Sequence, residues 1–166
     1  MNLDKFFMKI AWDVASRSQE PSTKVGCVIV DEDNNIIATG CNDYVMERGS
    51  KYSTDKKPVR YLISIHAEMR ALITAKKSIK NCKVYVTHAS CENCLKHLIL
   101  AGVKEIIYDK LTTNTGFIQE DAMEAIIRMM KATGINNRNM NGISYIEDLK
   151  LNNLFPKKLL KTQLDK

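Results

Sequence analysis

The fold is decided by two motifs, Ile65-His66-Ala67-Glu68-Met69-Arg70-Ala71-Leu72 and Ser90-Cys91-Glu92-Asn93-Cys94. His66 precedes Cys91 by 25 residues, which leaves room for one helix and one strand between them. One imidazole and two thiols form a three-ligand zinc set, and such a set keeps a fourth position open for chemistry. Glu68 follows His66 by two residues and can face a water molecule at that position. The two motifs therefore predict a catalytic zinc site that activates water.

Hydrophobic periodicity on both sides of these motifs predicts alternating helices and strands. Helices are expected at residues 3–16, 66–78, 91–101 and 119–133, and strands at residues 24–30, 36–40, 83–87, 105–108 and 142–146. The polar stretch 41–57 leads into the histidine motif, so we expect it to form a wall of the active site. A hairpin followed by alternating helices and strands predicts an α/β protein, a three-layer α/β/α sandwich with a mixed five-stranded sheet.

Length and composition are typical of one domain. The chain has 166 residues, of which 45% are hydrophobic and 27% charged, and this length allows a sizeable core. We assign residues 1–150 to a single zinc-dependent domain and residues 151–166 to a C-terminal extension or tail. The sequence contains no run of about 18 apolar residues, so no membrane span is predicted. Residues 1–5 do not resemble a secretory signal. An odd number of cysteines with one Cys-x-x-Cys favours a reducing cytoplasm.

The net charge of +6 permits two interpretations. It suits a phosphorylated or nucleic-acid partner, and it equally describes a solvated basic surface. A polynucleotide-binding surface would interleave basic and aromatic residues, and no such stripe is present in a chain with 7% aromatic residues.

Each metal motif is ambiguous when it is considered alone. A single Cys-x-x-Cys is also typical of half a structural zinc site or of a thioredoxin-like redox pair. A redox pair normally starts the helix after the first strand, whereas Cys91 follows the third predicted strand. A structural zinc would need a fourth protein ligand, such as Cys41 or His88, and would leave Glu68 without a role. Because both motifs start helices, two helix N-termini can converge on one ion, which favours a catalytic zinc.

The combined motifs resemble the signature of the zinc-dependent nucleobase deaminases. The resemblance extends over roughly residues 16–108 and is greatest to the deoxycytidylate (dCMP) deaminases. It rests on Lys24–Val30, Gly40–Asn42, Tyr61, Tyr85–Thr87 and Ala101–Val103, besides the two motifs. It implies a cytidine deaminase-like fold over residues 1–150 and a zinc hydrolase that converts dCMP to dUMP and ammonia in pyrimidine deoxynucleotide metabolism.

The resemblance also implies roles for the residues that match. The Zn²⁺ cofactor would be held by His66, Cys91 and Cys94. Glu68 would be the catalytic acid and base, accepting a proton from water and passing it to the cytosine ring and the leaving amine.

Substrate contacts are implied at further matching positions. Asn42 would bind the sugar hydroxyl, the backbone of Ala67 would contact the base edge, and Tyr61 would line the substrate site. The alternative for Asn42 is an ordinary turn residue after a strand. Cations near the expected mouth are candidate phosphate ligands or ordinary surface charges: Lys24, Arg48, Arg60 and Arg70.

The chain departs from the deaminases that it resembles at three places. Ser90 replaces a proline, Arg70 replaces an asparagine, and residues 43–45 replace a loop of glycine and proline. That loop, in relatives, helps to shape the nucleotide pocket and the regulatory nucleotide site. The alternatives are therefore a deaminase of another nucleoside, nucleotide or polynucleotide base, or a non-enzymatic structural zinc protein. The family implies a homo-oligomer, either a dimer or a hexamer, and a deoxynucleoside triphosphate as a possible effector, with no membrane partner.

Overall fold

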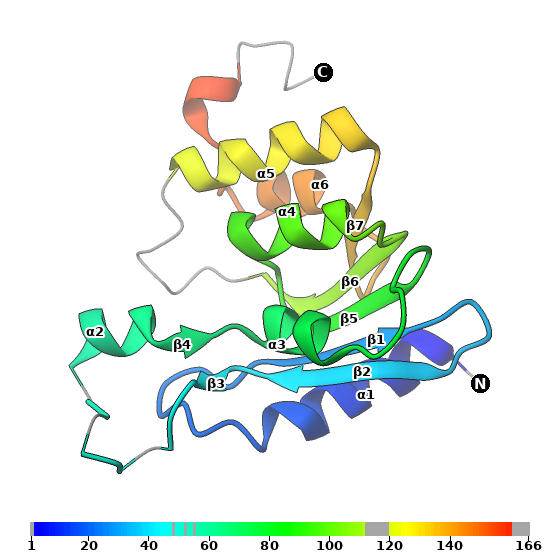
Figure 1. Cartoon of the computed structure of the whole chain (residues 1–166). Helices are drawn as coiled ribbons and strands as arrows, with labels where there is room; N and C mark the ends of the chain where they lie inside the picture. Colours follow the sequence, from blue (N-terminus) through cyan, green and yellow to red (C-terminus); the bar gives the residue numbers. More distant parts are fainter. Residues whose placement is uncertain (1, 48, 52, 55, 112–119, 161–166) are drawn as a thin grey trace.

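A mixed five-stranded sheet forms the centre of the structure, with helices on both faces (Figure 1). The computed structural model describes residues 2–47, 49–51, 53–54, 56–111 and 120–160. The strands are β1 (Gly26–Val30), β2 (Ile36–Cys41), β5 (Lys83–His88), β6 (Glu105–Lys110) and β7 (Asn136–Asn139), in the spatial order β2-β1-β5-β6-β7. β1 is antiparallel to β2 and β5, whereas β5, β6 and β7 are parallel. The predicted α/β/α sandwich is confirmed.

Two apolar clusters lie between the sheet and the helices on its two faces. Helix α1 (Leu3–Ala15) packs Phe7 and Ala11 against Val28 and Tyr85 on one face. The larger cluster, on the other face, takes side chains from four helices. These are α3 (Ala67–Thr74), α4 (Glu92–Leu100), α5 (Glu120–Thr133) and α6 (Tyr145–Leu151). Successive residues of a strand point to opposite faces, so each central strand contributes to both clusters. In the part of the chain that the structure describes, no helix is long and apolar enough to cross a bilayer.

The fifth strand lies elsewhere than the sequence predicted. The prediction of a strand at 142–146 is wrong, because β7 occupies Asn136–Asn139 and α6 begins at Tyr145. The Ser144 side chain accepts a hydrogen bond from the Glu147 backbone N–H, which is one half of a capping box. β7 is polar and pairs through its backbone with β6, so hydrophobic periodicity does not reveal it.

The predicted wall at residues 41–57 includes one strand of a small two-stranded sheet and leads into a short helix. β3 (Asp43–Tyr44) pairs with β4 (Ser64–Ile65), and α2 (Lys57–Leu62) lies between them in the chain. Helix α2 has six residues and no side-chain N-cap, so it leaves little signal in the sequence. Because Ile65 directly precedes His66, this two-stranded sheet positions the start of α3.

The C-terminal segment packs against the domain. Phe155 and Leu159, the latter in a 3₁₀ helix (Lys157–Leu159), are buried in the larger apolar cluster. The boundary at residue 150 between a domain and a tail stays a prediction. Residues 112–119, which include the first residue of the predicted helix at 119–133, and residues 161–166 lie outside the described part of the chain.

Replacement of Gly26 by alanine is expected to destabilise the fold by about 3 kcal/mol, because overpacking of a tight core contact forces the backbone to move. A Cβ at Gly26 would lie 1.9 Å from the carbonyl oxygen of Ala11 and 2.6 Å from the backbone nitrogen of Ala15. Urea denaturation measures the loss in the free energy of unfolding. Gly134→Ala is the control: it has a positive φ of 69° but an open environment, and should cost about 1 kcal/mol. A Gly26 effect no larger than the Gly134 effect would contradict the close approach of α1.

Candidate metal centre and active site

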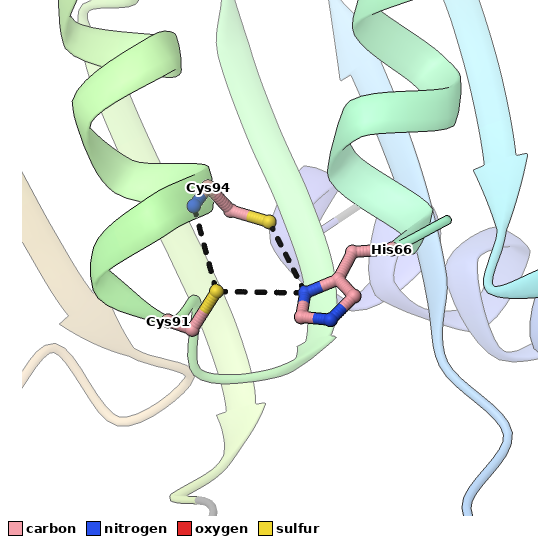
Figure 2. Close-up of side chains that lie close together, drawn as sticks. All are labelled: His66, Cys91 and Cys94. Carbon is pink, nitrogen blue, oxygen red and sulfur yellow. Dashed lines mark hydrogen bonds between the residues drawn. The ribbon is translucent and has the colours of Figure 1, made fainter. Parts of the chain in front are cut away.

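Two helix N-termini bring three metal-binding side chains together (Figure 2). His66 is the N-cap of α3, Cys91 is the N-cap of α4, and Cys94 lies in the first turn of α4. The Nδ1 atom of His66 lies 3.4 Å from the Sγ atom of each cysteine. The candidate ligand atoms of the three residues all lie within 4.8 Å of one another. His66 and Cys91, which are 25 residues apart in the sequence, therefore lie in one cluster with Cys94.

This cluster fits a zinc ion. Tetrahedral zinc with ordinary Zn–S and Zn–N bonds separates sulfur and nitrogen ligands by about 3.5 Å, which agrees with the observed N···S distances. Within the described residues, no fourth His, Cys, Asp or Glu joins the group. His88, one of the alternative ligands, instead packs its ring against Trp12 with the centroids 5.6 Å apart. A three-ligand set with an open position is the donor arrangement of catalytic zinc.

The ligands of the cluster differ in how readily they give up a proton. The pKa of Cys91 is lowered to about 4, because Cys94 donates a hydrogen bond to its sulfur and His66 adds a second hydrogen bond and positive charge. The hydrogen bond with Cys91 in turn raises the pKa of His66 to about 9, against the effect of burial. The sulfur of Cys91 is therefore readily deprotonated, as metal binding through a thiolate requires, whereas His66 has to give up a proton before its Nδ1 can bind a metal ion.

Glu68 lies in the first turn of α3 and is 4% exposed. Burial raises the pKa of its carboxyl, and the negative charge of Cys91 raises it further. Helix α3 packs closely on β2, since a Cβ at Gly40 would lie 2.3 Å from the carbonyl oxygen of Ala67. The close packing fixes the helix turn that carries both His66 and Glu68. A buried carboxyl with a raised pKa can hold and release a proton, as the predicted role of Glu68 requires.

Three other predicted substrate residues lie in three different segments. Asn42 accepts a hydrogen bond from the Val25 backbone at 2.7 Å and donates one to the Thr23 carbonyl at 2.8 Å. Ala67 is fully buried in the first turn of α3, and Tyr61 is partly buried on α2 beside Arg60. Their contacts with substrate stay predictions.

The four candidate phosphate ligands differ in their surroundings. Lys24 is exposed, and its Nζ donates to the Ser16 carbonyl at 3.4 Å. Arg60 is buried and Arg70 is partly exposed, and each pairs with a carboxylate. Arg48 lies outside the described residues.

A buried ion pair joins three segments beside the site, and nothing in the local sequence indicates it. Arg60 on α2 lies 3.2 Å from the Glu20 carboxylate, and both side chains are less than a tenth exposed. The same carboxylate accepts hydrogen bonds from the hydroxyls of Tyr44 on β3 and Ser22. Glu20 therefore connects the loop before β1 to β3 and α2. The contact could be found only from the folded chain, because its members are far apart in sequence.

Replacement of Glu20 by glutamine is expected to destabilise the protein by about 3 kcal/mol at pH 7, since the buried charge of Arg60 loses the Glu20 carboxylate. Burial alone would raise the pKa of Glu20, but hydrogen bonds from Ser22 and Tyr44 and the charge of Arg60 lower it below its usual 4.5. The stabilisation is thus complete above pH 4.5 and is lost as the pH falls through the lowered pKa.

Urea denaturation at pH 7 and at about pH 3 measures this difference, which should shrink in acid. Asp13→Asn is the control, because its pair with Lys9 is largely exposed and should contribute little. A Glu20→Gln effect of equal size at both pH values would contradict the ionised pair.

Comparisons with known proteins agree with this geometry. The family model "Cytidine and deoxycytidylate deaminase zinc-binding region" matches residues 1–110. An uncharacterized deaminase in the luxG 3' region of Aliivibrio fischeri is 36% identical over 102 residues, covering 61% of this chain and 69% of that protein. The deoxycytidylate deaminase of Homo sapiens is 32% identical over 112 residues, which are 63% of this chain and 62% of the human enzyme.

A solved structure extends the similarity to the fold. The dCMP deaminase of the cyanophage S-TIM5, in apo form, superposes with a TM-score of 0.63 at 25% identity. The superposition covers 83% of this chain and 97% of the phage chain. With the zinc-binding region matched over most of the chain and the His/Cys/Cys cluster in place, the protein belongs to the cytidine and deoxycytidylate deaminase family.

Proposed function

We propose that this protein is a cytoplasmic zinc hydrolase that converts dCMP to dUMP and ammonia in pyrimidine deoxynucleotide metabolism. The observation that carries the proposal is the convergence of His66, Cys91 and Cys94 next to the buried carboxyl of Glu68. The similarity to the human deoxycytidylate deaminase and to the phage dCMP deaminase supports dCMP as the substrate.

The residues of the site suit hydrolytic deamination. His66, Cys91 and Cys94 would hold a Zn²⁺ ion, which would supply Lewis-acid activation of a water molecule. Glu68 takes the proton of that water on a carboxylate oxygen and delivers it to ring nitrogen N3 of cytosine. The water oxygen adds to C4 of the ring. Glu68 then moves the proton of the new C4 hydroxyl to the amine, the C4–N bond breaks, and ammonia leaves. One water molecule is consumed, and cytosine becomes uracil.

The remaining predicted residues would position the nucleotide. The backbone of Ala67, at the start of α3, would contact the base edge. The side-chain nitrogen of Asn42 carries a second N–H beside the one that donates to Thr23, and that hydrogen can bind a sugar hydroxyl. Tyr61 and Lys24 would line the outer part of the site. We include a homo-oligomer and a deoxynucleoside triphosphate effector in the proposal, because the family resemblance implies both.

The test is ammonia release by zinc-replete protein. The substrates are dCMP, CMP, dCTP, deoxycytidine, dAMP, dGMP and cytosine-containing single-stranded DNA, each with and without dCTP or dTTP. Selective turnover of dCMP is expected. Turnover of a different substrate alone would keep the deaminase chemistry and overturn the assignment of dCMP. No ammonia from any substrate, with zinc bound, would overturn the proposed function.

A further inference from the structure

The candidate phosphate ligands differ in their surroundings, and those of Arg70 favour a binding role. We propose that Arg70 binds the 5'-phosphate of the nucleotide substrate and that Asp43 holds its guanidinium in the binding orientation. This inference rests on the proposed function and names the residue that distinguishes a nucleotide from a nucleoside.

The first observation is that Asp43 is fixed at both carboxylate oxygens. One oxygen accepts the Tyr44 backbone N–H at 2.9 Å, and the other accepts Nη1 of Arg70 at 3.0 Å. The Asp43 side chain is 14% exposed, whereas Arg70 is 36% exposed. A nearly buried, immobilised carboxylate therefore orients a guanidinium that is still open to solvent.

The second observation is that Arg70 has donors left over. A guanidinium carries five N–H donors in a planar fork. Among the described residues, the bond to Asp43 is the only hydrogen bond that the Arg70 side chain makes. The remaining donors are available to an anion, and the planar fork matches phosphate oxygens in a bidentate manner.

The third observation is the position of the pair relative to the metal centre. Arg70 follows His66 by one turn of α3, about 6 Å along the helix axis. Asp43 directly follows Asn42 and pairs across β3 and β4 with Ile65, the residue before His66. The segments that carry the metal histidine and the proposed sugar ligand thus also carry the Arg70–Asp43 pair. The 5'-phosphate is one sugar away from the base, so it would lie within reach of Arg70.

The other cations fit the role less well. Arg60 is 6% exposed, and its guanidinium pairs with the buried Glu20 carboxylate. Lys24 is a flexible point charge bound to a backbone carbonyl. Asp43 and Arg70 are also two of the positions at which the chain departs from the deaminases that it resembles, and the structure shows that they pair with each other.

The test compares a substrate that has the phosphate with one that lacks it. In Arg70→Gln, kcat/KM for dCMP is expected to fall about 100-fold, while kcat/KM for deoxycytidine changes less than about threefold, because a charged bidentate contact is lost only with the nucleotide. Arg70→Lys should lie between the two, since it keeps the charge without the fork. Asp43→Asn should weaken dCMP binding through KM with little change in kcat. Arg128→Gln, which breaks the exposed pair with Glu124 on α5, is the matched control and should change neither substrate.

Two results would overturn the inference. Equal losses on dCMP and deoxycytidine in Arg70→Gln would show that Arg70 only supports the fold of the site. Equal kcat/KM for the two substrates in the unmodified protein would show that the phosphate is not recognised. Zinc content and thermal unfolding check the folding of each variant, and Arg70→Lys decides the question if Arg70→Gln does not fold. Failure of the proposed function would appear separately, as absence of dCMP turnover in the unmodified protein.

Discussion

Glu68→Gln is expected to lower kcat for deamination by about 1,000-fold while the protein keeps its zinc. General acid and base catalysis by a positioned side chain contributes a factor of this order, and an amide can neither take nor deliver the proton. Glu68 is suited to the role because it is buried in the first turn of the helix that begins at His66, with its pKa raised by burial. Initial rates of ammonia release, with zinc measured in the same samples, give the result.

The matched control for this prediction is Glu92→Gln. Glu92 lies in the first turn of α4 between the two cysteines of the motif, so it adds a similar negative charge near His66. It has no proposed proton to carry, and its removal should change kcat by less than about tenfold. If Glu68→Gln retained most of the turnover, the carboxylate would not be the acid and base, and a structural zinc would become the better interpretation.

Cys94→Ser is expected to remove the metal and abolish turnover. Cys94 is fully buried, its Sγ lies 3.4 Å from His66 Nδ1, and its backbone N–H donates to the Cys91 sulfur. Replacing the soft thiolate with a hydroxyl leaves two ligands, and zinc should fall from about one ion per chain to near zero. Metal analysis after dialysis and thermal unfolding measure the loss. A chelator should lower the melting temperature of the unmodified protein and leave that of Cys94→Ser unchanged.

Cys41→Ser supplies the control for the metal prediction and tests the structural alternative. Cys41 ends β2, and a structural zinc site could use it as a fourth protein ligand. It is not part of the His66, Cys91 and Cys94 group, so its replacement should leave zinc content and turnover intact. Loss of zinc in Cys41→Ser would indicate a closed, four-ligand site and would contradict the open position on which the mechanism depends.

Four of the five strands of the central sheet and the three residues of the candidate metal cluster could be predicted from the sequence. Apolar runs such as residues 26–30 and 83–88 identify buried strands because burial on both faces leaves few polar positions. The ligands were predictable because zinc chemistry restricts residue type and local spacing, and both motifs stand at helix N-termini. These are short-range constraints that a linear pattern can carry.

The tertiary structure alone decided the polar parts. β7 joins the sheet through backbone pairing with β6, and its asparagines give no hydrophobic pattern in the sequence. The Glu20–Arg60 and Asp43–Arg70 pairs join residues that are distant in the chain, and a charged residue in a sequence looks the same whether it is solvated or paired. The packing of α2, β3 and α3 decides which cation is buried in an ion pair and which stays open to solvent beside the metal centre. For that reason the sequence leaves four candidate phosphate ligands, and only the folded chain favours Arg70 among them.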